Sequence, residues 1–314
     1  MNQSKRLTEG ALLTAIFIGL ILVSVFVPVL SFFAMFVLPV PFVIYASRYD
    51  WRPSLIMLAV SMLLSILFAT IFSLPITLLM GLGGIMIGSA IYRQLTPYET
   101  WARGTFGFII GLLFAFVFTQ YVFGVNWVNE LESMMNESMD MTINTFEQFG
   151  MGEQTEEARE MLEASLDMLV NLLPVFIALI AIGLAFLSQW VSYKIIRRLD
   201  NKEIKFPPFR HLRFPVSLIW VYFFALIITL IVSEQSNIFH LAAENLLVLT
   251  GVLMAIQGFS FIFYYAHHKN MSKAIPILIV VLTILFPMLF FYLVRILGII
   301  DLGFGLRDRL SKKE

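Results

Sequence analysis

The sequence contains seven long runs that lack aspartate, glutamate, lysine and arginine altogether. A helix that crosses the hydrocarbon core of a membrane needs about 20 mostly apolar residues. Five runs have room for one such helix, whereas the first two, 10–47 and 53–92, are long enough for a helical hairpin each. Only 13% of the residues are charged, against roughly 25% in a soluble domain. We therefore expect an integral membrane protein built from helices.

Helix-breaking residues divide the two longest runs. Pro28 and Ser31 interrupt the first run, and Ser73 and Pro75 interrupt the second. The second segment is short and contains Leu-Pro-Val-Pro at 38–41, which predicts a kinked or only partly helical span. The expected fold is an all-α polytopic membrane bundle of 8–9 transmembrane segments. The candidate spans are 11–30, 33–47, 54–72, 75–92, 104–124, 169–192, 214–233, 242–266 and 274–298.

The basic residues indicate which side each connecting segment faces. Segments rich in lysine and arginine stay in the cytoplasm, and every second connecting segment of this chain is basic. This alternation places the amino terminus in the cytoplasm and predicts a multi-pass protein of the bacterial cytoplasmic (inner) membrane. The basic residues concerned are Lys5, Arg6, Arg48, Arg52, Arg93, Arg103, Lys194, Arg197, Arg198, Lys202, Lys205, Arg210, Arg213, Lys269 and Lys273.

The carboxyl-terminal end conflicts with this alternation. Nine crossings would put the tail outside the cell, yet residues 306–314 are basic. Dropping the short second span would invert every later loop and break the charge rule. Two alternatives remain open. Either the tail is external, or the segment 274–298, which Pro287 interrupts, forms a hairpin or lies partly in the membrane interface.

The stretch 125–168 is expected to be an external acidic insertion. It carries eleven acidic residues and one basic residue, Arg159. Apolar residues recur at helical spacing in 156–170 and again around 131–146, which predicts two amphipathic helices. Phe-Gly-Met-Gly at 149–152 separates them. This helical hairpin either shields the outer mouth of the bundle or serves as a lid or docking site for a partner.

Two further regions complete the expected organisation. Residues 193–213 form a basic cytoplasmic loop with seven basic and two acidic residues. Such a loop is attracted to anionic lipid, and docking of a cytoplasmic partner is the alternative. Residues 214–314 add carboxyl-terminal membrane helices and a basic tail.

The sequence contains no motif that carries chemistry. The phosphate-binding P-loop, the zinc motif HExxH, the nucleophile motif GxSxG and cysteine are all absent. We therefore expect no enzymatic activity, no cofactor and no metal site, and the net charge of +0 gives no reason to expect a nucleic-acid partner. The glycine-rich stretch 81–88 does not match a dinucleotide-binding loop, so Gly84 and Gly88 are predicted to serve helix packing.

Two groups of residues are candidates for contacts with other molecules. Small residues spaced four apart in the first span are typical of a face that packs on another helix; they are Ala11, Ala15 and Gly19. A second group lies at the right depth for a small-molecule pocket that opens outward; it consists of Gln120, Tyr121, Asn126 and Trp127. Anchoring at the membrane interface is the alternative role of the two aromatic residues in this group.

The first six spans resemble the substrate-binding S components of energy-coupling-factor vitamin transporters. The resemblance lies in a basic amino terminus, the stretch LTEGALLTAIFIGLILVSVFVP, a short second span with prolines and two closely paired apolar spans. It implies a six-helix membrane core, over 1–124 and 169–192, that binds a small solute from the outer side. It also implies that Ala11, Ala15 and Gly19 contact a coupling membrane subunit, with ATPases as further partners besides membrane lipid.

The whole chain resembles the YybS-like family of bacterial membrane proteins more closely. The tail LGIIDLGFGLRDR, with Asp301 and Arg307, is similar to the carboxyl-terminal pattern of that family. Two functions remain open. The first is the binding of a small solute or of a partner transporter subunit by the S-component-like core. The second is a membrane scaffold or regulator that recruits envelope or cytoplasmic partners without transport.

Overall fold

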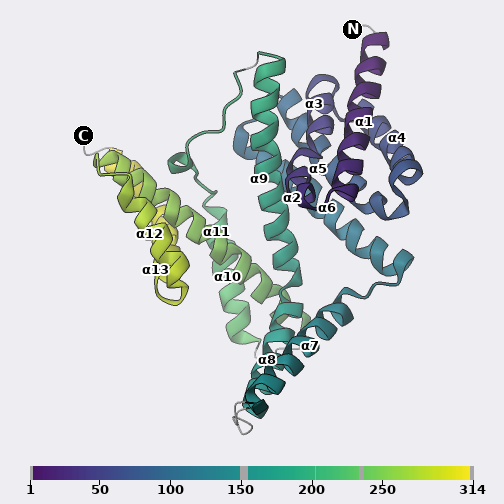
Figure 1. Ribbon diagram of the computed structural model, residues 1–314. Coiled ribbons are helices and arrows are strands. Elements are labelled where there is room, and N and C mark those ends of the chain that lie inside the picture. Colours follow the sequence, from purple (N-terminus) through teal and green to yellow (C-terminus); the bar gives the residue numbers. More distant parts are fainter. Residues whose placement is uncertain (1–2, 149–154, 202, 233–236, 312–314) are drawn as a thin grey trace. The chain divides into compact units, whose positions relative to one another are not determined.

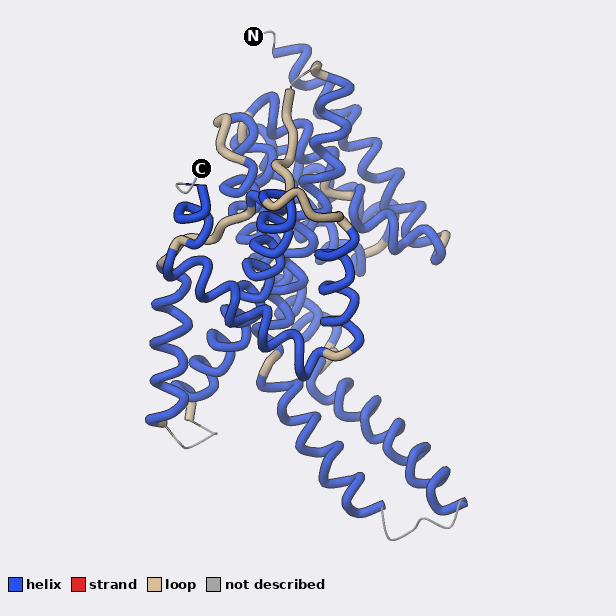
Figure 2. The backbone as a smooth tube through the Cα atoms, turned by 90° about the vertical axis from the view of Figure 1, so that its left-hand side faces the viewer, coloured by secondary structure: helices blue, strands red, loops and turns tan. Residues whose placement is uncertain are grey.

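The computed structural model describes residues 3–148, 155–201, 203–232 and 237–311 (Figure 1). All regular secondary structure in these residues is helical, as the blue helices of Figure 2 show. Eight helical segments in this part of the chain are long and apolar enough to cross a membrane, which confirms the predicted polytopic bundle. The chain divides into two compact units, unit 1 (Met1–Phe206) and unit 2 (Pro207–Glu314). The boundary falls inside the basic segment 193–213.

Unit 1 contains six of the eight candidate spans. Its second span is broken at Leu38 and Pro39, where α2 ends and α3 begins, as its proline-containing sequence predicts. The helical elements of unit 1 are α1 (Gln3–Phe26), α2 (Pro28–Val37), α3 (Val40–Tyr49), α4 (Trp51–Ala69), the 3-10 turn η1 (Ile71–Ser73), α5 (Leu74–Tyr92), α6 (Pro97–Phe123), α7 (Trp127–Gln148), α8 (Thr155–Asn171) and α9 (Leu173–Leu199).

Glycines allow α5 to approach α3 closely in the core of unit 1. A methyl group added at Gly84 would lie 2.6 Å from the carbonyl oxygen of Pro39, and one added at Gly88 would lie 2.5 Å from the carbonyl oxygen of Val43. Both glycines are buried. These contacts confirm the predicted packing role of the two glycines. They also fix the position of α3, whose last turn carries Arg48.

The two predicted amphipathic helices are present as α7 and α8. They lie at the end of unit 1 opposite to the amino terminus (Figure 1), which is the separation that the alternation of charge predicts. Met139 of α7 is buried, whereas Met134 and Met141 are 67% and 62% exposed. The predicted break at 149–152 lies outside the described residues. The exposed methionines give this acidic hairpin an adaptable apolar surface.

Helix α9 is longer than the predicted span 169–192. It continues to Leu199, so the first bases of the predicted loop lie on the helix itself. Neither proline nor glycine interrupts its second half, and lysine and arginine are good helix formers. The helix ends just before Asn201, whose φ of 49° is the left-handed conformation common after a helix. The bases that lie on the helix are Lys194, Arg197 and Arg198.

Unit 2 corrects the predicted last span, 274–298. Pro287 lacks the N–H group that a helix interior needs and disfavours a helical conformation at the residue before it. Phe286 accordingly has φ −129° and ψ 64°. The segment is therefore two helices, α12 and α13, which lie side by side (Figure 1). The elements of unit 2 are the 3-10 turn η3 (Phe209–His211), α10 (Ser217–Ile231), α11 (Ile238–His268), α12 (Ala274–Leu285), α13 (Pro287–Phe304) and α14 (Leu306–Ser311).

The tail of unit 2 returns to the basic segment that precedes α10. Arg307 Nη1 donates to the carbonyl oxygen of Arg210 at 2.8 Å, and Arg213 pairs with Asp308 at 2.8 Å. Residues 307–308 and 210–213 therefore lie at the same end of unit 2. Of the two alternatives for the last segment, this geometry favours the hairpin, which keeps the basic tail on the side of the other bases.

Candidate functional site

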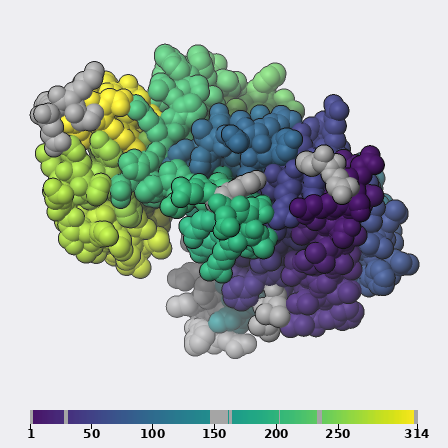
Figure 3. All heavy atoms as spheres, turned by 90° about the horizontal axis from the view of Figure 1, so that it is seen from above, coloured from purple at the N-terminus to yellow at the C-terminus, as the bar shows by residue number. Residues whose placement is uncertain are grey.

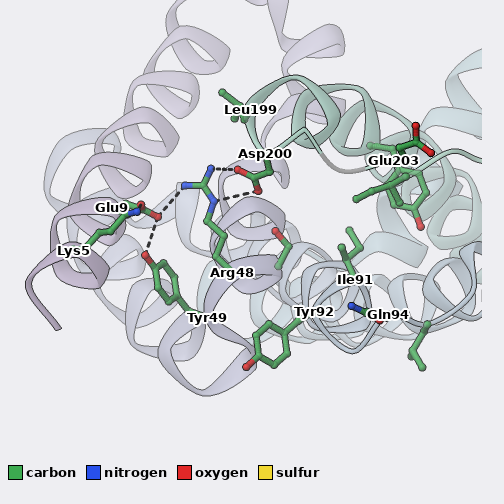
Figure 4. Close-up of a pocket in the computed structure, with 14 residues that line it drawn as sticks. Lys5, Glu9, Arg48, Tyr49, Ile91, Tyr92, Gln94, Leu199, Asp200 and Glu203 are labelled. Atoms are coloured by element: carbon green, nitrogen blue, oxygen red, sulfur yellow. Dashed lines mark hydrogen bonds and ion pairs between the residues drawn. The ribbon is translucent and has the colours of Figure 1, made fainter. Parts of the chain in front are cut away.

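Arg48 joins three helical elements at the end of unit 1 that carries the amino terminus (Figure 4). Its Nη1 donates to Glu9 Oε2 at 2.9 Å, and its Nη2 donates to Asp200 Oδ1 at 2.6 Å. The hydroxyl group of Tyr49 donates to the same Glu9 oxygen at 3.0 Å. We call Glu9, Arg48, Tyr49 and Asp200 the Arg48 junction. It ties α1 to α3 and to the residue that follows α9.

The Arg48 junction is partly shielded from solvent. The side chains of Arg48, Glu9 and Asp200 are 27%, 20% and 16% exposed. Hydrogen bonds between charged groups are shorter and stronger than neutral ones, and this shielding limits the competition from water. The sequence did not reveal the junction, because Glu9 and Asp200 lie 39 and 152 residues from Arg48. Its one sequence hint is that Arg48 ends a charge-free run.

Replacing Arg48 with alanine is expected to lower the free energy of unfolding by about 2 kcal/mol, because two carboxylates lose their charged donor. Unfolding of the purified protein in detergent measures this change. Arg93→Ala is the matched control, because its Nε lies 4.0 Å from Asp50 and its side chain is 46% exposed. Such a pair contributes about 1 kcal/mol or less. Equal losses in the two variants would show that the Arg48 junction holds nothing together.

A cavity of about 940 Å³ adjoins the Arg48 junction. Its lining combines tyrosine side chains with acidic and basic groups (Figure 4). Such a lining suits a small polar solute with donors and acceptors of both kinds. No group of three or more histidine, aspartate or glutamate side chains in the described residues is placed to hold a metal ion. The charged residues that line the cavity are Lys5, Glu9, Arg48, Asp200 and Glu203.

The small residues of α1 face away from the core of unit 1. Ala11, Ala15 and Gly19 are exposed, and a methyl group added at Gly19 would meet nothing within 4 Å. We call these three residues the small-residue face. Two of them, Ala11 and Ala15, also line a groove of about 340 Å³ together with Ile56 and Val60 of α4. Figure 3 shows α1, in dark purple, at the surface of the molecule.

The residues predicted for an outward-facing pocket lie around the turn from α6 to α7. Asn126 Oδ1 accepts hydrogen bonds from the N–H groups of Val128 (3.1 Å) and Asn129 (3.3 Å), which caps α7. Trp127 Nε1 donates to Thr119 Oγ1 at 2.7 Å. Gln120 and Tyr121 are exposed, the latter to 83%. Asn126 and Trp127 thus make contacts that stabilise the turn from α6 to α7. A ligand-binding role for the group of four residues stays a prediction.

A buried polar network holds the end of α13 in unit 2. Asp301 Oδ2 accepts hydrogen bonds from Gln257 at 2.6 Å and from Arg307 at 3.0 Å. Arg307 also donates to Ser260 Oγ at 3.2 Å. The side chains of Arg307 and Asp301 are 8% and 1% exposed. Asp301 and Arg307 belong to the carboxyl-terminal sequence pattern noted above. Their partners on α11, Gln257 and Ser260, lie 44 and 47 residues away in the sequence, so the pattern did not predict them.

A second ion pair, between Arg213 and Asp308, lies at the surface of unit 2. The two side chains are 40% and 59% exposed. Two hydrogen bonds to Asp308, of 3.0 and 2.8 Å, raise the pKa of Arg213 above its usual value. Unit 2 thus offers a buried and an exposed arginine–aspartate pair for direct comparison.

Comparisons with known proteins place this chain among membrane proteins. The family model described as "Predicted membrane protein (DUF2232)" matches residues 15–302. The chain is 28% identical to "Uncharacterized protein YybS" of Bacillus subtilis (strain 168) over 311 residues, which cover 99% of this chain and 100% of that protein. No solved structure matches the chain. The matches support the YybS-like resemblance over the whole length.

Proposed function

Because the chain belongs to the membrane protein family DUF2232, we propose that it is a binding protein of the bacterial cytoplasmic membrane that docks a partner membrane subunit on α1. It has no enzymatic activity of its own. Its amino terminus and its basic segments face the cytoplasm, and the acidic hairpin α7–α8 faces outward.

The observation that carries this proposal is the open small-residue face of α1. Within a membrane, helices associate through close van der Waals contact, and small side chains permit that contact. In unit 1 the opposite face of α1 is already used, because Leu13, Phe17 and Ile21 are buried in the core. Within the described residues of unit 1 the small-residue face stays exposed, and the groove beside it can accept larger side chains of a second helix.

The Arg48 junction supports the same role by holding the end of α1. Glu9 lies two residues before Ala11, so the hydrogen bond from Arg48 to Glu9 fixes the first turns of the docking helix. A helix that is held in place before docking loses less conformational freedom on binding. The partner that fits the resemblance to S components is a coupling subunit, and ATPases would supply the energy for uptake.

The test compares two glycine-to-leucine variants with the same local space. Gly19→Leu fills the small-residue face, and Gly183→Leu fills an equally open position on α9. Co-purification from bacterial membranes, with subunits quantified by mass spectrometry, should show a loss of an integral membrane partner of about tenfold or more for Gly19→Leu alone, which corresponds to about 1.4 kcal/mol. Retention of the same subunits by both variants, with unchanged thermal stability, would rule out docking on this face.

A second candidate function, the binding of a small polar solute, is favoured by the cavity beside the Arg48 junction. Mass spectrometry should then detect a small molecule that co-purifies with the wild-type protein and is absent from the Arg48→Ala variant. Envelope proteins recovered without any integral membrane subunit or small molecule would instead favour a scaffold.

A further inference from the structure

A second cavity, of about 380 Å³, lies within unit 2. It is bounded by residues 208–210, the end of α11 and the start of α12. Its charged and protonatable lining residues are Arg210, His267 and Lys273, and none of the described residues that line it is acidic. The remaining wall is mainly apolar. This arrangement differs from the cavity of unit 1, where acidic and basic groups are mixed.

The wall that carries Arg210 is held in place by the buried network. Ser260 Oγ lies 2.8 Å from the carbonyl oxygens of both Phe209 and Leu212, and Arg307 Nη1 donates to the carbonyl oxygen of Arg210. The backbone around Arg210 is therefore fixed before any ligand arrives. Rigid support of this kind reduces the entropic cost of binding.

Arg210 has an unused donor. Its Nε atom is buried and has no hydrogen-bond partner among the described residues. A buried donor without a partner is costly, and Arg210 as a whole is only half-buried and lines the cavity, so a turn of its side chain that brings a donor to an acceptor in the cavity is favourable. Phosphate oxygens are strong acceptors for arginine and lysine.

We propose that this cavity binds the phosphate headgroup of an anionic phospholipid. The three donors recognise the phosphate, and the apolar wall, with Phe263 and Ile277, lies beside the first carbons of the acyl chains. Ile277 and Leu278 are 53% and 57% exposed, which extends this apolar surface along α12. Anionic lipids of the cytoplasmic leaflet attract basic segments of this kind. The inference is independent of partner docking on α1.

A soluble phosphate ester shares the headgroup chemistry, so the experiment must separate the two sources. The full-length protein in detergent is titrated separately with phosphatidylglycerol, phosphatidylcholine and glycerol 3-phosphate. Native mass spectrometry measures how much of each ligand is bound. The cavity variant is Arg210→Gln with Lys273→Gln. The matched control is Arg52→Gln with Arg103→Gln, which removes the same charge at exposed positions of unit 1.

The wild-type protein should prefer phosphatidylglycerol to phosphatidylcholine, and the cavity variant should bind phosphatidylglycerol about 20-fold more weakly. The control should stay close to the wild type. Equal losses in both variants, absence of a preference for the anionic lipid, or displacement of the lipid by an equal concentration of glycerol 3-phosphate would each overturn the proposal.

Folding of the cavity variant is checked by its thermal transition. If it is unfolded, Lys273→Glu replaces it, because Lys273 is exposed and bears no part of the buried network. That variant should bind phosphatidylglycerol at least about fivefold more weakly, and unchanged binding would again overturn the proposal.

Discussion

Replacing Asp301 with alanine is expected to lower the free energy of unfolding of unit 2 by about 3–5 kcal/mol. The substitution leaves Arg307 charged in a site where its side chain is 8% exposed. It also removes the oxygen that accepts from Gln257 at 2.6 Å. Gln257 and Arg307 thus lose the carboxylate oxygen to which both donate. Water can replace this acceptor only if α11 and α13 move apart. Thermal or denaturant unfolding in detergent measures the change.

The exposed pair in the same unit supplies the control. Asp308→Ala removes the carboxylate from Arg213, but both side chains are already in contact with solvent. Its cost should be about 1 kcal/mol or less. The double variant Asp301→Ala with Arg307→Ala should cost less than the sum of the two single changes, because neither then leaves a lone charge behind. Additive costs, or equal costs for Asp301→Ala and Asp308→Ala, would show that the buried pair is not coupled.

Replacing Gly298 with alanine is expected to destabilise the contact between α11 and α13 by about 3 kcal/mol. The added methyl group would collide with the carbonyl oxygen of Met254 and would lie 2.8 Å from the N atom of Gly258. Both are backbone atoms, so the strain is relieved only if the helices move apart. In an open helical position the same change would favour the helix by roughly 0.5–1 kcal/mol.

Gly303 on the same helix is the matched control. A methyl group there would lie 3.5 Å from Ile219 Cδ1, an ordinary van der Waals distance. Gly303→Ala should therefore be neutral or slightly stabilising. The thermal transitions of the two variants, measured side by side, decide the matter. If Gly298→Ala melts at or above the wild-type temperature, the close packing of α11 on α13 is wrong.

The sequence was sufficient to predict the six spans of unit 1 and the hairpin α7–α8, because both follow from local patterns. In unit 2 the predicted span 214–233 is the 15-residue helix α10, which is shorter than the eight candidate spans. Absence of charge over a long run marks a span, and apolar residues at helical spacing mark α7 and α8. The sequence also predicted an interruption at Pro287, but it did not predict that the tail contacts the backbone of Arg210. That contact depends on Arg307, Ser260 and the backbone around Arg210, which are far apart in the chain.

The candidate sites were predicted less completely for the same reason. Ala11, Ala15 and Gly19 could be selected from their spacing, since a helix places such residues on one face. The Arg48 junction could not be found in this way, because its members come from α1, α3 and the end of α9. A charge at the end of an apolar run has many potential partners, and only the packing of the helices selects among them.

The most direct test of the whole account is the side of the membrane on which the acidic and the basic segments lie. The chain contains no cysteine, so single cysteines can be introduced at Ser138 of α7 and at Ser272 between α11 and α12, both exposed. In intact cells a membrane-impermeant maleimide should label Ser138→Cys at once and Ser272→Cys only after the cells are permeabilised. Labelling of Ser272→Cys from outside, or protection of Ser138→Cys until permeabilisation, would contradict the account.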